Sequence, residues 1–414
     1  MTNEPINERY LKEQQGKPSA TIPETIRMLE IAKSAFQNMP EQDEQVYQDM
    51  KDRFPATDEP LNIEGSAALL QAINEISEKK FDFIIPLKDI EITDFPLLAK
   101  TNSREVRFNI KEADTKNVMG TAVSTYGARK QFLDLAFSGN TFAERGFKRD
   151  ATSEIIADFN ELIKKAKPDE KYRFRLIQTG ELSSNEYLLR SVSTKEGYKV
   201  YDNGVVLYMS LRAISDFSQR ANKLFYVENA HVTDSRLDAD FRSASAQKLN
   251  HDVSVQIGIH VSNSEIADSS ATFTVIYWIT NKKQTITLAD GPLFSINHHY
   301  TSASIAAELR KALSLNERST SIYKAVNEAQ MYSPVDEISL EKIFQSLIRS
   351  TQKLPKNYRN QLENLKEIAT QESYSLLQLF GKLQTLADET KDEDVIWYIR
   401  IRLNKFLKKE YGRS

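Results

Sequence analysis

The chain has 414 residues, of which 40% are hydrophobic and 27% are charged, and its 55 Lys and Arg against 58 Asp and Glu give a net charge of −3. This composition predicts a folded protein with a substantial core, and it excludes both wholesale disorder and a uniformly basic nucleic-acid coat protein. Because the chain has no Cys, disulfides, thiolate nucleophiles and thiolate zinc sites are excluded as well.

Residues 1–80 are predicted to form a helical N-terminal region. Residues 1–20 are polar and of mixed charge, which is not typical of a signal peptide, and we expect them to be mobile. Apolar residues recur at helical spacing over 22–39 and again over 65–79. No apolar run approaches the roughly 20 residues that cross a bilayer, so we expect a cytoplasmic protein with no membrane partner.

Residues 81–317 are predicted to form a central α+β domain. Helices are expected at about 125–138, 152–166 and 205–221. From 171 to 300 the chain is otherwise rich in short aromatic and β-branched runs that are separated by turn residues. Strands that follow one another with few crossover helices favour a largely antiparallel sheet with flanking helices over a doubly wound parallel one. The predicted fold class is therefore α+β.

Residues 318–414 are predicted to form an all-helical C-terminal domain, because helix-periodic segments follow one another there with only short breaks. The final helix is unusually apolar and aromatic around Trp397 and Tyr398. This pattern indicates a possible contact surface for a protein partner.

Basic and aromatic residues alternate at the start of the first long β-like run. In the sequence KYRFR the cations Lys171, Arg173 and Arg175 fall on one face of a strand, while the intervening aromatic residues fall on the other. Such a row could follow the phosphates of a single nucleic-acid strand, with tyrosines nearby to stack on bases. The alternative is an ordinary solvent face whose cations pair with Glu181 and Glu186. The complete predicted nucleic-acid site is Lys171, Arg173, Arg175, Arg190, Tyr198, Lys199 and Tyr201.

Signatures of catalysis are weaker. The chain contains no P-loop, no Gly-rich dinucleotide loop and no His-Glu-x-x-His sequence, so we expect no cofactor and no bound metal. The candidates for an acid, a base or a metal ligand are His298 and His299 with Asp290. A second candidate is the pair Asp238 and Asp240, which share one face if they lie on a strand. The alternative for that pair is a solvated surface.

Two runs in the central region resemble the phage- and plasmid-like family known as domain of unknown function 932. They are LLRSVSTKEGYKVYDNGVVLYMSL at 188–211 and VQIGIHVSNSEIADSSATFTVIYW at 255–278, the second of which contains Asn263, Ser264 and Glu265. The resemblance implies a mobile-element protein from the neighbourhood of replication and recombination genes. From the residues alone, Asn263 and Ser264 are typical of a turn, and a loop that faces a ligand is the alternative.

The first functional prediction is a non-catalytic protein that binds or anneals single-stranded DNA or RNA and that forms a homo-oligomer. The second is a protein–protein interaction module, such as a host-defence effector or inhibitor, that acts through residues 318–414. The third is a metal-dependent nuclease or hydrolase that uses the histidines or carboxylates named above. A binding function is favoured over an enzyme.

Overall fold

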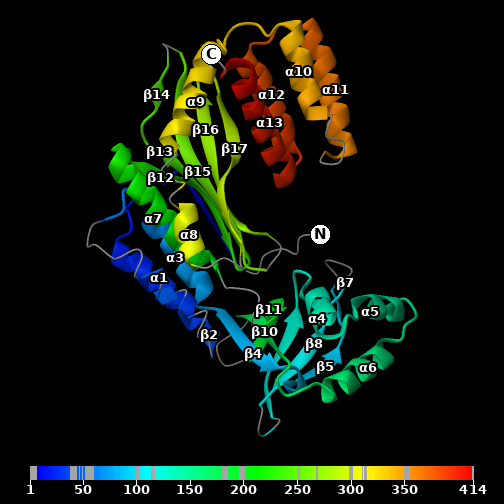
Figure 1. Cartoon of the computed structure of the whole chain (residues 1–414). Coiled ribbons are helices and arrows are strands. Elements are labelled where there is room, and N and C mark those ends of the chain that lie inside the picture. The colour runs from blue at the N-terminus through cyan, green and yellow to red at the C-terminus, as the bar shows by residue number, and fades with distance from the viewer. Residues whose placement is uncertain are drawn as a thin grey trace.

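The computed structural model describes residues 7–37, 44–45, 47–48, 50–51, 60–98, 103–112, 115, 117–179, 185–194, 201–249, 252–266, 269–297, 302–309, 311, 315–348 and 354–412. Within this part of the chain, two sheets form the centres of two halves of the molecule, and helices pack against each of them (Figure 1).

The larger half contains an eight-stranded, largely antiparallel sheet. Its main strand order is β1-β12-β13-β15-β16-β17, with β3 beside β12 and β14 beside β15. β1 is the first strand of the chain and pairs with β12, which lies more than 200 residues later in the sequence. The strands are β1 (Glu8–Lys12), β3 (Ile63–Glu64), β12 (Phe225–Thr233), β13 (Arg236–Ser243), β14 (Gln247–Lys248), β15 (Ser254–Ser264), β16 (Ala271–Thr280) and β17 (Thr285–Ile296).

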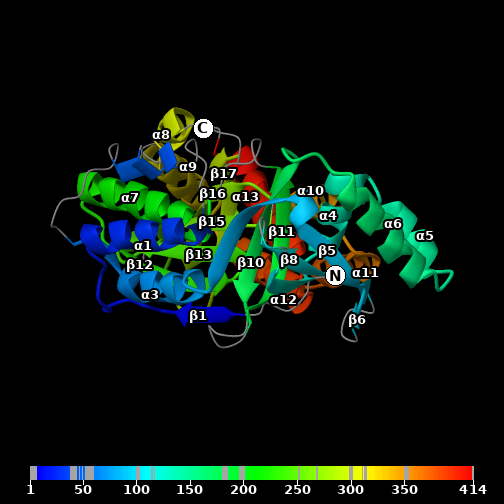
Figure 2. The ribbon, with the colours of Figure 1, turned by 90° about the horizontal axis from the view of Figure 1, so that it is seen from below.

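One face of this sheet is covered by α1 (Ile22–Ser34), α3 (Ser66–Ser77), α7 (Asn203–Ala221) and α8 (Ser302–Leu309) (Figures 1 and 2). The strands alternate as a half-buried sheet requires. In β13 the side chains of Leu237, Ala239 and Phe241 are buried in the core on the helical side, while the alternate side chains are polar. The polar alternates therefore gather on the opposite face.

The C-terminal part is helical, as predicted. Its helices are α9 (Leu315–Glu328), α10 (Glu337–Ile348), α11 (Lys356–Gln371), α12 (Leu376–Glu389) and α13 (Glu393–Tyr411). α13 packs along β17 and α9, and its side chains Trp397 and Ile401 reach Ile276 and Trp278 on the polar face of the sheet. Among the described helices, none is both long enough and apolar enough to span a membrane.

The smaller half contains a seven-stranded mixed sheet in the order β2-β4-β10-β11-β9-β8-β5. Helices α4 (Ala128–Phe137), α5 (Asn140–Phe147) and α6 (Thr152–Lys164) pack on it around a second core that is rich in Phe (Figure 1). The strands are β2 (Phe36–Gln37), β4 (Lys80–Pro86), β5 (Ile90–Asp94), β8 (Arg107–Lys111), β9 (Val118–Ser124), β10 (Lys171–Gln178) and β11 (Glu186–Thr194), beside a separate pair β6 (Leu97–Leu98) and β7 (Ser103–Arg104).

The α+β class is confirmed, with two corrections in detail. Residues 1–20 were expected to be mobile, but Glu8–Lys12 form an edge strand of the large sheet. This strand carries mostly exposed polar side chains and is held by backbone pairing, so no apolar pattern in the sequence predicted it. The stretch 81–317, expected to hold one sheet, supplies strands to both sheets, because β4, β5 and β8 to β11 build most of the smaller one and β12 to β17 most of the larger one.

Candidate functional site

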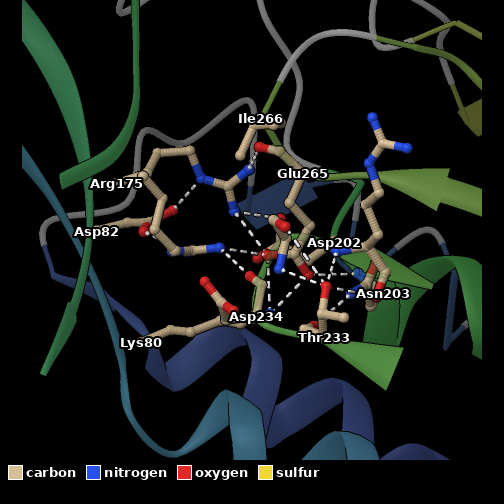
Figure 3. Close-up of polar contacts among 12 residues, drawn as sticks. Lys80, Asp82, Arg175, Asp202, Asn203, Thr233, Asp234, Glu265 and Ile266 are labelled. Atoms are coloured by element: carbon tan, nitrogen blue, oxygen red, sulfur yellow. Dashed lines mark hydrogen bonds and ion pairs between the residues drawn. The ribbon is translucent and has the colours of Figure 1, made fainter. Parts of the chain in front are cut away.

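Two of the predicted cations, Arg175 and Arg190, lie in a buried charge cluster where the two halves meet, and Figure 3 shows Arg175 among its partners. Three strands of the small sheet supply the cations, and the carboxylates come from both halves of the molecule. All of these side chains are at most 4% exposed. The members of the buried charge cluster are Lys80, Asp82, Arg175, Arg190, Asp202, Asp234 and Glu265.

Glu265, which follows β15, is the centre of this cluster. Its carboxylate accepts hydrogen bonds from Lys80 Nζ at 2.7 and 2.8 Å and from Arg190 Nη1 at 2.8 Å. The backbone N–H of Asn203, at the start of α7, donates to the same carboxylate at 2.8 Å. Arg175 Nε donates to Asp82 Oδ2 at 2.8 Å, and its guanidinium also contacts Asp202. Ion pairs therefore join β4, β10 and β11 to α7 and β15.

The electrostatics of the cluster divide its carboxyls into two kinds. Burial by itself would raise the pKa of Glu265, but Lys80, Arg190 and Arg175 outweigh burial and hold that pKa well below its usual range. Burial raises the pKa of Asp202 to about 6, because the attraction of Arg175 does not compensate for lost hydration and for the nearby charge of Glu265. Three cations thus favour the ionised form of Glu265, whereas the pKa of Asp202 is raised to about 6.

The prediction of an exposed cationic row is wrong for Arg173, Arg175 and Arg190, which are at most 1% exposed. Lys171, at the end of β10, is exposed. The alternation itself is correct, since Phe174 packs in the core of the small half. However, β10 is an inner strand between β4 and β11, and the larger half covers the face that carries the arginines. The prediction was wrong because it assumed that a strand face with several cations lies in solvent.

The remaining predicted residues lie apart from one another. Tyr201 is fully buried, so it offers no stacking surface, and that prediction is also wrong. Asp290 on β17 accepts hydrogen bonds from Lys408 Nζ at 2.7 Å and Asn404 Nδ2 at 3.1 Å on α13, so it anchors that helix to the sheet. Asn263 is a buried residue of β15 rather than a turn residue. Tyr198, Lys199, His298 and His299 lie outside the described residues.

A second group of polar side chains lines a pocket of about 770 Å³ on the polar face of the large sheet. Its floor comes from β1, β12, β13 and β15, and the beginning of α13 forms one wall. We call it the sheet pocket. It is lined by Tyr10, Leu11, Lys12, Tyr126, Asn229, Ala230, His231, Thr233, Ser235, Arg236, Asp238, Ala239, Asp240, His260, Ile266, Asp388, Glu393, Ile396, Trp397 and Arg400.

Strand register assembles the floor of the sheet pocket. Residues that pair directly across neighbouring strands point to the same face. Asp238 on β13 pairs with His231 on β12, which in turn pairs with Tyr10 on β1. Two residues along, Asp240 pairs with His260 on β15. The pair Asp238 and Asp240, one of the predicted candidates, therefore shares a face as expected, and a histidine from another strand faces each carboxylate.

His260 forms the polar centre of this floor. Its Nδ1 lies 2.8 Å from Asp240 Oδ1, and its Nε2 lies 3.8 Å from Asp238 Oδ1. The imidazole is largely buried, with its side chain 11% exposed, whereas the Asp238 side chain is 44% exposed toward the pocket. A carboxylate that accepts a hydrogen bond from one imidazole nitrogen fixes the tautomer of the ring. The other nitrogen is then free of a proton and can accept one from a ligand.

The wall is built by one face of α13. Glu393, Trp397 and Arg400 are spaced by four and three residues, so they project from the same side of the helix. The Asp392 side chain caps the helix by accepting from the backbone N–H of Asp394 at 3.0 Å. The Trp397 ring lies 4.3 Å from the His260 ring, centroid to centroid. Docking of the C-terminal helix thus completes a site that begins on the sheet.

Three carboxyl groups that line the sheet pocket have raised pKa values. Desolvation raises the pKa of Asp238 in spite of nearby His260 and Arg236. Desolvation also raises the pKa values of Glu393 and Asp388, against the attraction of Arg400. These carboxyls lack full compensation by cations, in contrast to Glu265 in the buried charge cluster.

Tyr126 connects the pocket to the buried charge cluster. It lines the pocket and donates from its hydroxyl to Asp234 Oδ1 at 3.0 Å. Its backbone has a positive φ of 52°, and Gly127 follows with a φ of 83° before α4 begins. For a bulky residue this left-handed conformation is strained, and it aims the ring from the small half across to the large one.

The described residues include no group of three or more His, Asp or Glu side chains that is arranged to hold a metal ion. Comparison of the chain with protein families, curated proteins and solved structures found no match. The resemblance to domain of unknown function 932 therefore stays a prediction.

The sequence analysis missed His231, Trp397 and Glu393 as members of one site. The alternation in RLDADFRS marked the floor, and the four-residue spacing of Glu393 and Trp397 marked a helix face. Neither pattern shows that the helix packs over the strand, because the two segments are about 150 residues apart in the chain.

Proposed function

We propose that this protein binds a small organic molecule in the sheet pocket and supplies it with an acid–base pair, His260 and Asp240. The observation that carries the proposal is the Asp240–His260–Asp238 array on the floor of a pocket of about 770 Å³. Ligand sites in proteins usually measure about 300–1,000 Å³ and combine a few converging polar groups with apolar or aromatic walls. The sheet pocket has both, since Trp397 and Ile396 border the polar floor.

The acid–base part of the proposal follows from the two nitrogens of His260. Asp240 occupies Nδ1 at 2.8 Å, so Nε2 is the atom that can exchange a proton with a ligand. Asp238, 3.8 Å from Nε2, can accept a hydrogen bond from the same ligand. Carboxylates that support an imidazole in this way stabilise the imidazolium that forms when the base takes a proton.

The two tryptophans of the chain provide a direct test, because Trp397 lies at the pocket and Trp278 belongs to the same small apolar cluster. A library of several hundred polar metabolites is screened by tryptophan fluorescence and by thermal unfolding. We expect at least one compound to change the fluorescence and to raise the unfolding temperature. His260→Gln should abolish both responses.

Lys405→Ala is the matched control, because Lys405 is an exposed residue of α13 that does not line the pocket. It should respond as the wild type does. The proposal fails if no compound alters either signal, or if the compounds that bind do so equally well to His260→Gln.

Nucleic-acid binding and partner binding through residues 318–414 stay predictions, although some of the side chains that motivated each of them are buried. Of the predicted cations in the described residues, Lys171 is exposed while the arginines are buried. Tyr398 is 9% exposed and donates to Leu347 O at 3.2 Å, so it packs within the helical domain. Fluorescence anisotropy with a labelled single strand, repeated at increasing salt, measures the nucleic-acid prediction directly.

A further inference from the structure

The side chains that line the sheet pocket include more carboxyl groups than Lys and Arg side chains. Four carboxyl groups line it, from two strand positions and from the junction of α12 and α13, and three cations lie around its edge. Two histidines complete the titratable groups. The carboxyl groups are Asp238, Asp240, Asp388 and Glu393, the cations are Lys12, Arg236 and Arg400, and the histidines are His231 and His260.

The cations around the pocket do not neutralise its floor. The Arg400 guanidinium stacks over the Trp397 ring, 5.4 Å from its centroid, and lies on the helix beside Glu393. Burial still raises the pKa of Glu393 despite this neighbour, and it raises the pKa of Asp238 despite Arg236. A further positive charge placed between these carboxyls would stabilise their ionised forms.

Aromatic rings border the same space. Trp397 lies against His260 on one side, and on the other the Tyr10 ring stacks on His231 with centroids 4.2 Å apart and planes 5° apart. The faces of Trp and Tyr attract cations, and the attraction grows when the cation is shielded from water. Carboxylates and aromatic faces therefore border one pocket from both sides.

We infer that the sheet pocket takes a small organic cation, an amine or amidine carried on a compact apolar or aromatic frame. The positive group would lie between Asp238 and Glu393, and the frame would lie along Trp397. A phosphate-bearing ligand is disfavoured by the same carboxylates. This inference rests on the proposed function and specifies the ligand class of that site.

The test uses pairs of probes that differ in charge but hardly in shape: benzamidine against benzamide, and phenethylamine against 2-phenylethanol. Binding is measured by isothermal titration calorimetry and by fluorescence of Trp397 in a Trp278→Phe background. We expect each charged probe to bind at least about tenfold more tightly than its neutral partner. The two probes of a pair make the same shape-dependent contacts, and the charged one adds charged hydrogen bonds and cation–π contacts.

The variants Asp238→Asn and Glu393→Gln remove one charge each and keep side-chain size. Each should weaken the charged probes by about three- to tenfold and leave the neutral probes unchanged. Lys405→Ala should bind all four probes as the wild type does, since Lys405 lies on the same helix outside the pocket.

The outcomes separate the inference from the proposed function. If neutral probes bind as tightly as charged ones, the ligand class is wrong while the pocket remains a binding site. If both charge-removing variants bind the charged probes as tightly as the wild type does, the probes bind elsewhere and the inference is overturned. If neither these probes nor the metabolite library changes Trp397 fluorescence, the proposed function fails together with the inference.

Discussion

Two charged regions of this protein lie close together and differ in how their charges are compensated. In the buried charge cluster, Glu265 contacts Lys80 and Arg190 directly, and no member is more than 4% exposed. In the sheet pocket, the Asp238 side chain is 44% exposed, and the nearest basic nitrogen given by the described residues is His260 Nε2 at 3.8 Å. Ions that are fully enclosed and paired hold elements together, whereas carboxyls in a concave, partly wet site keep capacity for a ligand.

This difference shows why the type of residue is a poor guide to its role. Arginine on a strand suggested a polyanion surface, yet Arg175 and Arg190 bond to groups of the larger half and so link the two halves of the molecule. Aspartate on a strand suggested an ordinary solvated face, yet Asp238 and Asp240 line the sheet pocket. The surroundings of each charge decide its role, and these depend on tertiary packing.

Arg175→Ala should have the largest effect on the stability of the protein. Removing this guanidinium leaves Asp82 and Asp202 buried without a principal partner, which should lower the free energy of unfolding by about 3–5 kcal/mol. Urea denaturation followed by circular dichroism measures the change. Lys171→Ala, an exposed change on the same strand, is the control and should leave the midpoint where it is. If the two variants unfold alike, the cluster does not hold the halves together.

Asp202→Asn tests the titration of the buried charge cluster. The pKa of Asp202 is raised to about 6 from 3.8, so between about pH 4 and pH 6 the folded protein binds a proton that the unfolded chain has lost. The contribution of Asp202 to stability is therefore present below pH 4 and lost as the pH rises through 6. Asn carries no titrating charge, and it can still accept from Arg175.

The difference in unfolding free energy between Asp202→Asn and wild type should grow in favour of the variant as the pH rises from 4 to 7. The total change should be on the order of 1–3 kcal/mol. Unfolding midpoints at several pH values measure this difference. Glu265 acts in the opposite direction, because its lowered pKa gives stability that is lost as the pH falls below about 4.5, but it is common to both proteins. Parallel curves for the two proteins would contradict the prediction.

Tyr126→Phe affects the residue that joins the two regions. It removes the hydroxyl that donates to Asp234 Oδ1 at 3.0 Å and should cost about 1–2 kcal/mol, since Asp234 is fully buried. Thermal unfolding measures the loss. Tyr332→Phe is a suitable control, because the Tyr332 hydroxyl donates to a backbone oxygen at an exposed site. Equal effects in the two variants would show that burial of Asp234 adds nothing.

Asp240→Asn should have the smallest effect on stability and a clear effect on binding. The Asp240 carboxylate holds His260 Nδ1 at 2.8 Å in a site that is open to water, so the change should cost less than about 1 kcal/mol in unfolding. Binding of benzamidine, measured by calorimetry, should weaken at the same time. If Asp240→Asn lowers the free energy of unfolding as much as Arg175→Ala does, Asp240 stabilises the fold in the same way as the buried charge cluster.

Much of the architecture followed from periodicity. The apolar spacing predicted a helix over 152–166, where the structure has α6 at Thr152–Lys164. It also predicted a helix over 22–39, of which the structure has α1 at Ile22–Ser34, while Phe36–Gln37 form β2 instead. The helical C-terminal region and the α+β class were also correct. Such patterns are local, because they come from the rotation per residue of a helix or the two-residue repeat of a strand.

The site was predictable only in part. The two-residue repeat of side-chain direction in a strand placed Asp238 and Asp240 on one face, and the structure agrees. It could not supply His260 as their partner, because the register between β13 and β15 depends on which strands pair. It could not supply Trp397 either, since the position of α13 depends on contacts with β17 and α9.

The sequence by itself determined the helices, the strands and the side chains that share a face on each. Only the tertiary structure decided which charged face would be enclosed and which would stay open. The reason is that the cost of burying a charge depends on partners brought from distant segments. Glu265 lies 185 residues from Lys80 in the chain, and the two meet only after the halves pack together.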